Sequence, residues 1–128
     1  MTAAHHIPVT AKPLILHVED EEVQRELMKR ILGNSSFAVL QASNAAEALE
    51  MFRECPVCLV IADHLIGGQI TGAELAEHMK AIKPTVPIVL YTGQPPEIMH
   101  SVDVFIHKGE PIPNLLAILR DLIKRYCE

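Results

Sequence analysis

The sequence predicts one α/β domain: a doubly wound, five-stranded parallel sheet in the order 2-1-3-4-5, with helices on both faces. Three observations point to this fold class. Five short apolar runs recur along the chain, and segments with apolar residues at helical spacing separate them. The length of 128 residues suits a single domain. Strands that are apolar throughout are typical of parallel sheets covered on both faces, and 2-1-3-4-5 is a common order for them.

The five strands are predicted where apolar runs are bounded by proline, glycine or polar residues. They cover residues 14–18, 37–42, 57–62, 88–91 and 102–106. Residues 1–12 are mixed in character and are expected to form a loose leader, so that the domain itself covers residues 13–128.

The helices are predicted from apolar spacing and from capping residues. Val23, Leu27 and Ile31 repeat at helical spacing, and Gly33-Asn34 is a typical helix end. The later helix signals are Asn44 with Glu47, Thr71 with Glu74, and Pro113 ahead of the apolar stripe Leu115, Leu119, Leu122, Ile123 and Tyr126. Between the fourth and fifth strands, Pro95-Pro96 leaves room for little more than two turns, so this fourth helix is expected to be shortened.

Composition excludes several classes of function. The formal net charge of -5 disfavours direct binding to nucleic acid. No apolar run approaches the ~18 residues that a membrane span needs, and residues 1–13 lack the apolar core of a signal peptide. With three cysteines and no export signal, a cytoplasmic location with reduced thiols is expected.

Polar side chains follow four of the predicted strands at the point where each strand ends. Glu19-Asp20 follow the first, Asp63 the third, Thr92 the fourth and Lys108 the fifth. In this fold, ligands bind at the carboxyl ends of the strands, where the strand order reverses between strands 1 and 3. The three carboxylates are therefore expected to meet there, where their repulsion favours a cation.

The residue types at this edge favour phosphate chemistry with Mg²⁺. Carboxylate oxygens without His or Cys at ligand spacing suit Mg²⁺, while Lys108 supplies a point charge for phosphate and Thr92 a hydroxyl. A carboxylate can act as a nucleophile and form an aspartyl-phosphate. The pattern predicts transfer of phosphate to Asp63.

Four segments in order resemble the receiver domain of two-component response regulators, the CheY-like superfamily. They are LILHVEDEE, LVIADHLIGG, IVLYTG and VFIHKGEP, and together they extend from Leu14 towards the last helix. The resemblance implies a flavodoxin-like fold and a signalling module that is not a turnover enzyme. Its chemistry would be limited to its own phosphorylation and dephosphorylation.

The resemblance also implies a role for each matching residue. Asp63 would accept phosphate from a histidine kinase or phosphotransfer protein. Thr92 would bond the phosphoryl group and swing inward, Phe105 would change rotamer with it, and Lys108 would pair with the phosphoryl group. The implied Mg²⁺ ligands are Glu19, Asp20, Asp63 and the backbone carbonyl of Leu65.

The chain departs from the family pattern in four places. Gly67 stands where a proline is usual, and the loop before Gly72 is one residue longer. Gly109 replaces the proline that follows the lysine with a cis bond, and the stretch from Thr92 to Lys108 is several residues shorter. Because that stretch carries part of the usual output face, an output domain and a homodimer both stay open as further partners.

Two other functions remain open from the residues. A pseudo-receiver would use the fold as a protein-interaction module without taking phosphate, and the departures at Gly67 and Gly109 motivate it. An enzyme of flavodoxin-like or hydrolase type would need a substrate pocket, and the sequence shows no cofactor loop. The sequence also contains a lone CxxC pair, Cys55-Pro56-Val57-Cys58, which fits a core cysteine better than a redox site. His64 follows Asp63 and either tunes the lifetime of the phosphorylated state or plays no special part.

Overall fold

The computed structural model describes residues 12–68 and 70–127, which form a five-stranded parallel sheet in the order β2-β1-β3-β4-β5. The strands are β1 (Leu14–Val18), β2 (Ala38–Ala42), β3 (Leu59–Ala62), β4 (Ile88–Thr92) and β5 (Val104–His107). The helices are α1 (Glu22–Gly33), α2 (Ala45–Glu54), α3 (Gly72–Ile82) and α4 (Ile112–Cys127). The predicted fold class and strand order are confirmed. The expected leader falls almost wholly outside the described residues.

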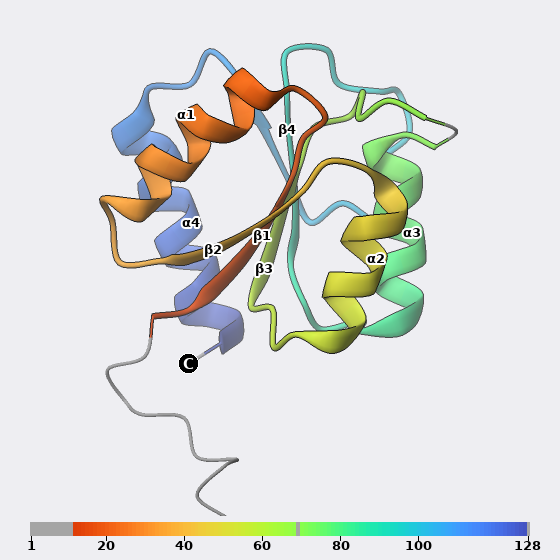
Figure 1. Cartoon of the computed structure of the whole chain (residues 1–128), viewed down its shortest axis with the longest axis horizontal. Coiled ribbons are helices and arrows are strands. Elements are labelled where there is room, and N and C mark those ends of the chain that lie inside the picture. The colour runs from red at the N-terminus through yellow and green to blue at the C-terminus, as the bar shows by residue number, and fades with distance from the viewer. Residues whose placement is uncertain (1–11, 69, 128) are drawn as a thin grey trace, which may run out of the picture.

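The sheet has one hydrophobic core on each face, with α1 and α4 on one side and α2 and α3 on the other (Figure 1). Successive residues of β1 and β3 alternate between the two cores, because successive side chains of a strand point to opposite faces. Ile15 and Ile61 pack under α1 and α4, whereas Leu16 and Val60 pack under α2 and α3. This alternation explains why the strands read as continuous apolar runs.

The predicted caps of α2 and α3 are confirmed. Asn44 accepts a hydrogen bond from the backbone N–H of Glu47 at 2.8 Å. Thr71 and Glu74 form a reciprocal capping box. This box begins α3 directly after the loop that follows Asp63, so it fixes the downstream end of that loop.

Helix α1 forms as predicted, but it buries a different face from the one that the spacing of Val23 and Leu27 marks. Met28 and Leu32 are the buried residues of α1, whereas Val23 is 76% and Leu27 53% exposed. Tyr126, on the predicted stripe of the last helix, is exposed as well. Two apolar stripes lie on α1, and periodicity alone does not say which of them faces the sheet.

The expected shortened fourth helix is wrong: residues 93–103, between β4 and β5, contain turns and bends but no helix. Pro95 and Pro96 supply no backbone N–H, and the segment is too short to bury a helical face before β5 begins. Its return to the sheet is fixed by Asp103, whose carboxylate accepts from the N–H of Ile88 and from Lys80, both at 2.7 Å.

Within residues 12–68 and 70–127, no helix combines the length and the apolar character that crossing a membrane requires.

Candidate functional site

Backbone hydrogen bonds extend the sheet by one residue beyond the strands, and these added residues carry the candidate site. The N–H of Glu19 donates to Ala42, that of Asp63 to Val18, and that of Lys108 to the Thr92 carbonyl, at 3.0, 3.2 and 3.1 Å. The parallel ladder therefore places Glu19, Asp63 and Lys108 at one edge of the sheet, the upper edge in Figure 1.

Lys108 joins two carboxylates from two other strands. Its Nζ lies 2.9 Å from Oδ2 of Asp63 and 3.2 Å from Oε1 of Glu19. Burial lowers the pKa of Lys108, but the hydrogen bond to Asp63 and the charges of Glu19 and Asp63 outweigh it, so that its pKa lies above the ordinary value. Lys108 is therefore a cation at neutral pH.

Glu19 is the more buried partner, with 2% of the residue exposed. Burial raises the pKa of its carboxyl above the ordinary value, although the charge of Lys108 opposes that shift. Its second oxygen, Oε2, accepts from the N–H of Glu21 at 3.3 Å. A nearby cation stabilises the charged form of a buried carboxylate of this kind.

Asp63 has one carboxylate oxygen for each of two donors. Oδ2 faces Lys108, while Oδ1 accepts a 2.6 Å hydrogen bond from the N–H of His64. The backbone beyond it is held by Gly72, whose N–H donates to the His64 carbonyl at 2.7 Å. A Cβ at Gly72 would lie 2.1 Å from the carbonyl oxygen of Asp63, so only glycine fits there. Helix α3 thus begins in direct contact with Asp63.

Asp20 lies on the solvent side of this cluster. Its Oδ2 is 3.1 Å from where a Cβ of Gly67 would be, so its carboxylate faces the loop after β3. Gly67 has φ of +71°, a left-handed conformation that favours glycine over the usual proline, because proline fixes φ near −65°. Glycine therefore replaces the usual proline at position 67 because this longer loop requires a positive φ there.

A hydrogen-bond network that sequence reasoning missed holds the acid pair in place. Nη1 of Arg25 donates to the backbone carbonyls of Glu19 and Asp20, both at 2.9 Å. Gln41 donates to the Arg25 carbonyl at 2.7 Å and lies 3.1 Å from Nδ1 of His17. The one available signal was a histidine inside an apolar strand, two residues before Glu19 and therefore on the same face.

His17 is buried in the sheet behind the acid pair, with 3% of the residue exposed. Burial, helped by the positive charges of Lys108 and Arg25, lowers its pKa from 6.5 to about 4. The imidazole is therefore neutral at physiological pH, and it serves as a hydrogen-bonding group of the support network.

The residues that could hold Mg²⁺ fit that ion in donor chemistry. Glu19, Asp20 and Asp63 supply carboxylate oxygens, and the Leu65 carbonyl accepts no backbone hydrogen bond among the described residues. The part of the chain that the structure describes contains no group of three or more His, Cys, Asp or Glu side chains already arranged for a metal. The ammonium group of Lys108 stands between Glu19 and Asp63 in the present arrangement.

Among the described residues, no hydrogen bond joins Thr92 or Phe105 to Asp63. Thr92 is buried, and its hydroxyl accepts from the N–H of Gln94 at 3.3 Å rather than bonding Asp63 or Lys108. Phe105 is half-buried and packs edge-on against His107, with ring centroids 6.5 Å apart. The assigned switching roles of both residues stay predictions.

The lone CxxC pair forms no disulfide, and Cys55 and Cys58 are both half-buried. The N–H of Cys58 donates to the Leu14 carbonyl, which places this residue at the start of β3, at the opposite end of the strands from Asp63.

Comparison with known sequences identifies the family. The family model described as response regulator receiver domain matches residues 15–120. The chain is 32% identical to the transcriptional regulatory protein AruR of Pseudomonas aeruginosa over 124 residues, which cover 88% of this chain and 50% of the relative. It is 33% identical over 82 residues to the autoinducer 1 sensor kinase/phosphatase LuxN of Vibrio harveyi, covering 64% of this chain and 10% of that protein. The chain thus spans half or less of the length of these curated relatives.

Solved structures give the same result. The response regulator TrrA of Thermotoga maritima, solved in complex with Mg²⁺ and BeF, superposes with a TM-score of 0.80 at 29% identity, covering 86% of this chain and 98% of that one. A signal receiver domain of an HD domain-containing protein from Pseudomonas fluorescens Pf-5 has a TM-score of 0.84 at 23% identity, covering 95% and 94% of the two chains, and shows the shared fold. The chain belongs to the response regulator receiver domain family of two-component signalling.

Proposed function

We propose that Asp63 accepts a phosphoryl group from a histidine kinase or a phosphotransfer protein, and that this modification switches the domain between two signalling states. The observation that carries the proposal is the position of Lys108, which pairs with both Asp63 and the buried Glu19 at the carboxyl edge of the sheet. The resemblance to the TrrA structure with bound Mg²⁺ and BeF supports it.

The proposed transfer follows from the groups around Asp63. A carboxylate oxygen of Asp63 attacks the phosphorus of a phosphohistidine, the P–N bond breaks, and the donor imidazole leaves with the bonding electrons. The Lys108 ammonium balances negative charge on the transferred group, while the N–H of His64 holds the second carboxylate oxygen. Mg²⁺, when bound by Glu19, Asp20, Asp63 and the Leu65 carbonyl, would neutralise further charge there.

An apolar surface beside the site supports docking of the phosphate donor. Val23 and Leu27 are exposed on α1, and Leu65 is 61% exposed in the loop after β3. The start of α1 and this loop lie along the same upper edge of the molecule (Figure 1). We expect a helix of the kinase or phosphotransfer protein to cover these side chains when its phosphohistidine meets Asp63.

The test is incubation with acetyl phosphate and Mg²⁺, followed by intact-mass measurement and mapping of the modified residue. The expected result is one added phosphoryl group on Asp63, absent from Asp63→Asn and unaffected in Asp121→Asn, whose carboxylate is exposed on α4 and pairs with Arg125. If neither acetyl phosphate nor beryllofluoride modifies Asp63, or if Asp63→Asn behaves like the parent chain, the proposal fails.

One observation favours a second candidate, a pseudo-receiver that binds partners without taking phosphate. The helix that the family usually carries between β4 and β5 is absent from the described residues. A magnesium titration separates the two functions. Binding of Mg²⁺ with no phosphorylation of Asp63 would favour the pseudo-receiver.

A further inference from the structure

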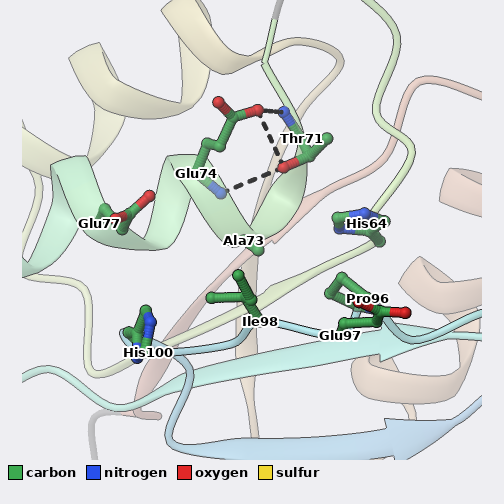
Figure 2. Close-up of a pocket in the computed structure, with 9 residues that line it drawn as sticks. All are labelled: His64, Thr71, Ala73, Glu74, Glu77, Pro96, Glu97, Ile98 and His100. Atoms are coloured by element: carbon green, nitrogen blue, oxygen red, sulfur yellow. Dashed lines mark hydrogen bonds between the residues drawn. The ribbon is translucent and has the colours of Figure 1, made fainter.

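A cavity of about 380 Å³ lies between α3 and the irregular segment that connects β4 to β5. Figure 2 shows its lining, with Glu74 and Glu77 on α3, and Ile98 and His100 on the connecting segment. The cavity follows from the fold, because residues 93–103 form no helix that could pack against this end of α3.

The lining of the cavity is acidic. It contains three glutamates, namely Glu74, Glu77 and Glu97, and no lysine or arginine. Hydrogen bonds from Thr71 lower the pKa of Glu74 and keep it charged. The side chains of Glu77 and Glu97 make no hydrogen bond or ion pair with any described residue. The cavity therefore presents two carboxylates without partners.

An aliphatic side chain borders these charges. Ile98 is 63% exposed although it is large and apolar, and Pro96 lies beside it on the same segment. A bound cation alone would not cover Ile98, and no metal-binding group of three or more side chains exists among the described residues. A basic side chain next to an aliphatic one matches both features.

His64 connects the cavity to the phosphoacceptor. Its backbone N–H donates to Oδ1 of Asp63 at 2.6 Å, while its ring lines the cavity. Nδ1 of this ring is buried and has no hydrogen-bond partner among the described residues. An unsatisfied buried polar atom destabilises the folded state, so a movement of the ring that gives Nδ1 a partner is favourable.

We propose that this cavity docks a basic segment of an output protein, which inserts an arginine or lysine beside Ile98, and that phosphorylation of Asp63 changes its affinity through His64. The coupling rests on the proposed function; the docking does not. A phosphoryl group on Asp63 offers further acceptor oxygens that compete for the His64 N–H, and the ring of His64 is part of the cavity wall. Any such coupling acts with equal strength in both directions.

The docking is tested with the capped dipeptide Leu-Arg, titrated into the ¹⁵N-labelled full chain. The matched probe is Leu-citrulline, which has nearly the same shape and no charge. The expected result is that Leu-Arg shifts the amide signals of His64, Glu77, Glu97, Ile98 and His100, and that Leu-citrulline binds about tenfold more weakly. Equal binding of the two probes, or shifts spread evenly over other acidic surfaces, overturns the proposal.

Matched variants locate the binding. Glu77→Gln with Glu97→Gln should weaken Leu-Arg about tenfold, whereas Glu26→Gln with Glu50→Gln, exposed glutamates on α1 and α2, should leave it unchanged. If Glu77→Gln with Glu97→Gln does not change the affinity for Leu-Arg, the proposed docking site is wrong. If sedimentation instead shows that the pair abolishes self-association of the chain, the occupant is a second copy, and the basic output segment is overturned.

The coupling is tested separately by repeating the titration with beryllofluoride and Mg²⁺. An affinity for Leu-Arg that changes at least about threefold supports coupling through His64. An unchanged affinity, when the Asp63 region itself responds to beryllofluoride, overturns the coupling but not the phosphoacceptor. No response at Asp63 counts against the proposed function, and the docking is then judged from the titrations without beryllofluoride.

Discussion

Nζ of Lys108 lies 2.9 Å from Oδ2 of Asp63, although the two residues are 45 positions apart in the sequence. This ion pair lies where β3 and β5 reach the same edge of the sheet, and Glu19 shares it from β1. The positive charge is therefore already in place before any phosphate arrives.

Replacing Lys108 tests that placement. Lys108→Ala should slow phosphorylation of Asp63 by acetyl phosphate about 100-fold, because a preorganised charge is lost where negative charge accumulates. It should also lower the free energy of unfolding by about 1–2 kcal/mol, because the buried carboxylate of Glu19 loses its cation. The loss is no larger because Lys108 is partly exposed, and solvent weakens the ion pair. Lys124→Ala, near the end of α4, is the matched control for both the rate and the urea midpoint. An unchanged rate in Lys108→Ala would contradict the role of this ion pair.

Gly72 is expected to tolerate no side chain. Gly72→Ala should cost about 3 kcal/mol of unfolding free energy, because its Cβ would lie 2.1 Å from the Asp63 carbonyl oxygen, and backbone cannot yield as a flexible side chain can. Gly33→Ala is the control, since nothing lies within 4 Å of a Cβ there. That change should stabilise the end of α1 by about 0.5–1 kcal/mol. Urea unfolding of both variants gives the comparison, and equal midpoints would show that Gly72 has more space than its contacts imply.

The buried His17 predicts that stability falls on acidification. Its folded pKa is about 4, below its ordinary 6.5, so between these values the unfolded chain binds a proton that the folded chain does not. Stability therefore rises with pH through this window, by about 3 kcal/mol for this one group.

The comparison of unfolding free energies at pH 4.5 and pH 7 isolates this contribution. The raised pKa of Glu19 acts in the opposite direction, so the measurement uses the difference between the parent chain and His17→Leu. The pH dependence should shrink in His17→Leu and stay unchanged in His78→Gln, which alters an exposed histidine. If His17→Leu retains the full slope, the titrating group lies elsewhere.

The imidazole of His107 takes part in holding the turn that carries Lys108. The N–H of Gly109 donates to Nδ1 of His107 at 2.8 Å, and a Cβ at Gly109 would lie 3.0 Å from that nitrogen. No cis peptide bond occurs among the described residues, so this turn differs from the family pattern with proline. A ring nitrogen bonded to the N–H two residues on resembles an Asx-turn.

The His107 turn predicts a specific rescue. His107→Ala should slow phosphorylation of Asp63 by about threefold to tenfold. The reason is that the hydrogen bond from the Gly109 N–H, which holds the backbone around Lys108, is lost. His107→Asn should restore most of the rate, since an asparagine oxygen can accept the same hydrogen bond. The measurement is the rate with acetyl phosphate at fixed Mg²⁺. Equal rates for the Ala and Asn variants would assign His107 no positioning role.

The sequence predicted the parts of the site that depend on chain topology. Glu19, Asp63 and Lys108 follow apolar runs, and parallel strands bring such ends together whatever the details of packing. It did not predict the contacts made by side chains of neighbouring elements. The bond from Arg25 to the acid-pair carbonyls depends on how α1 is rotated, and the two apolar stripes of α1 left that rotation undecided. The orientation of the Thr92 hydroxyl towards Gln94 likewise depends on local turn geometry.

The missing helix shows a second limit of the sequence. Pro95-Pro96 leaves room for little more than two turns before the fifth strand, and the sequence therefore predicted a shortened fourth helix there. The structure instead uses turns, with Asp103 fastening the end of the segment to Ile88 and Lys80. Tertiary anchoring of this kind outweighs a local preference and leaves no periodic signal.

The connection between β4 and β5 comprises residues 93–103, eleven in all. Parallel neighbouring strands usually need a connection of about a dozen residues or more, so this one is near the shortest length that can span the distance. Lengthening residues 93–103 is therefore expected to disturb the sheet less than shortening them. Removing even one residue would draw β5 along the sheet and carry Lys108 away from Asp63. The proposed phosphorylation of Asp63 therefore depends on the length of a segment that makes no described hydrogen bond to its carboxylate.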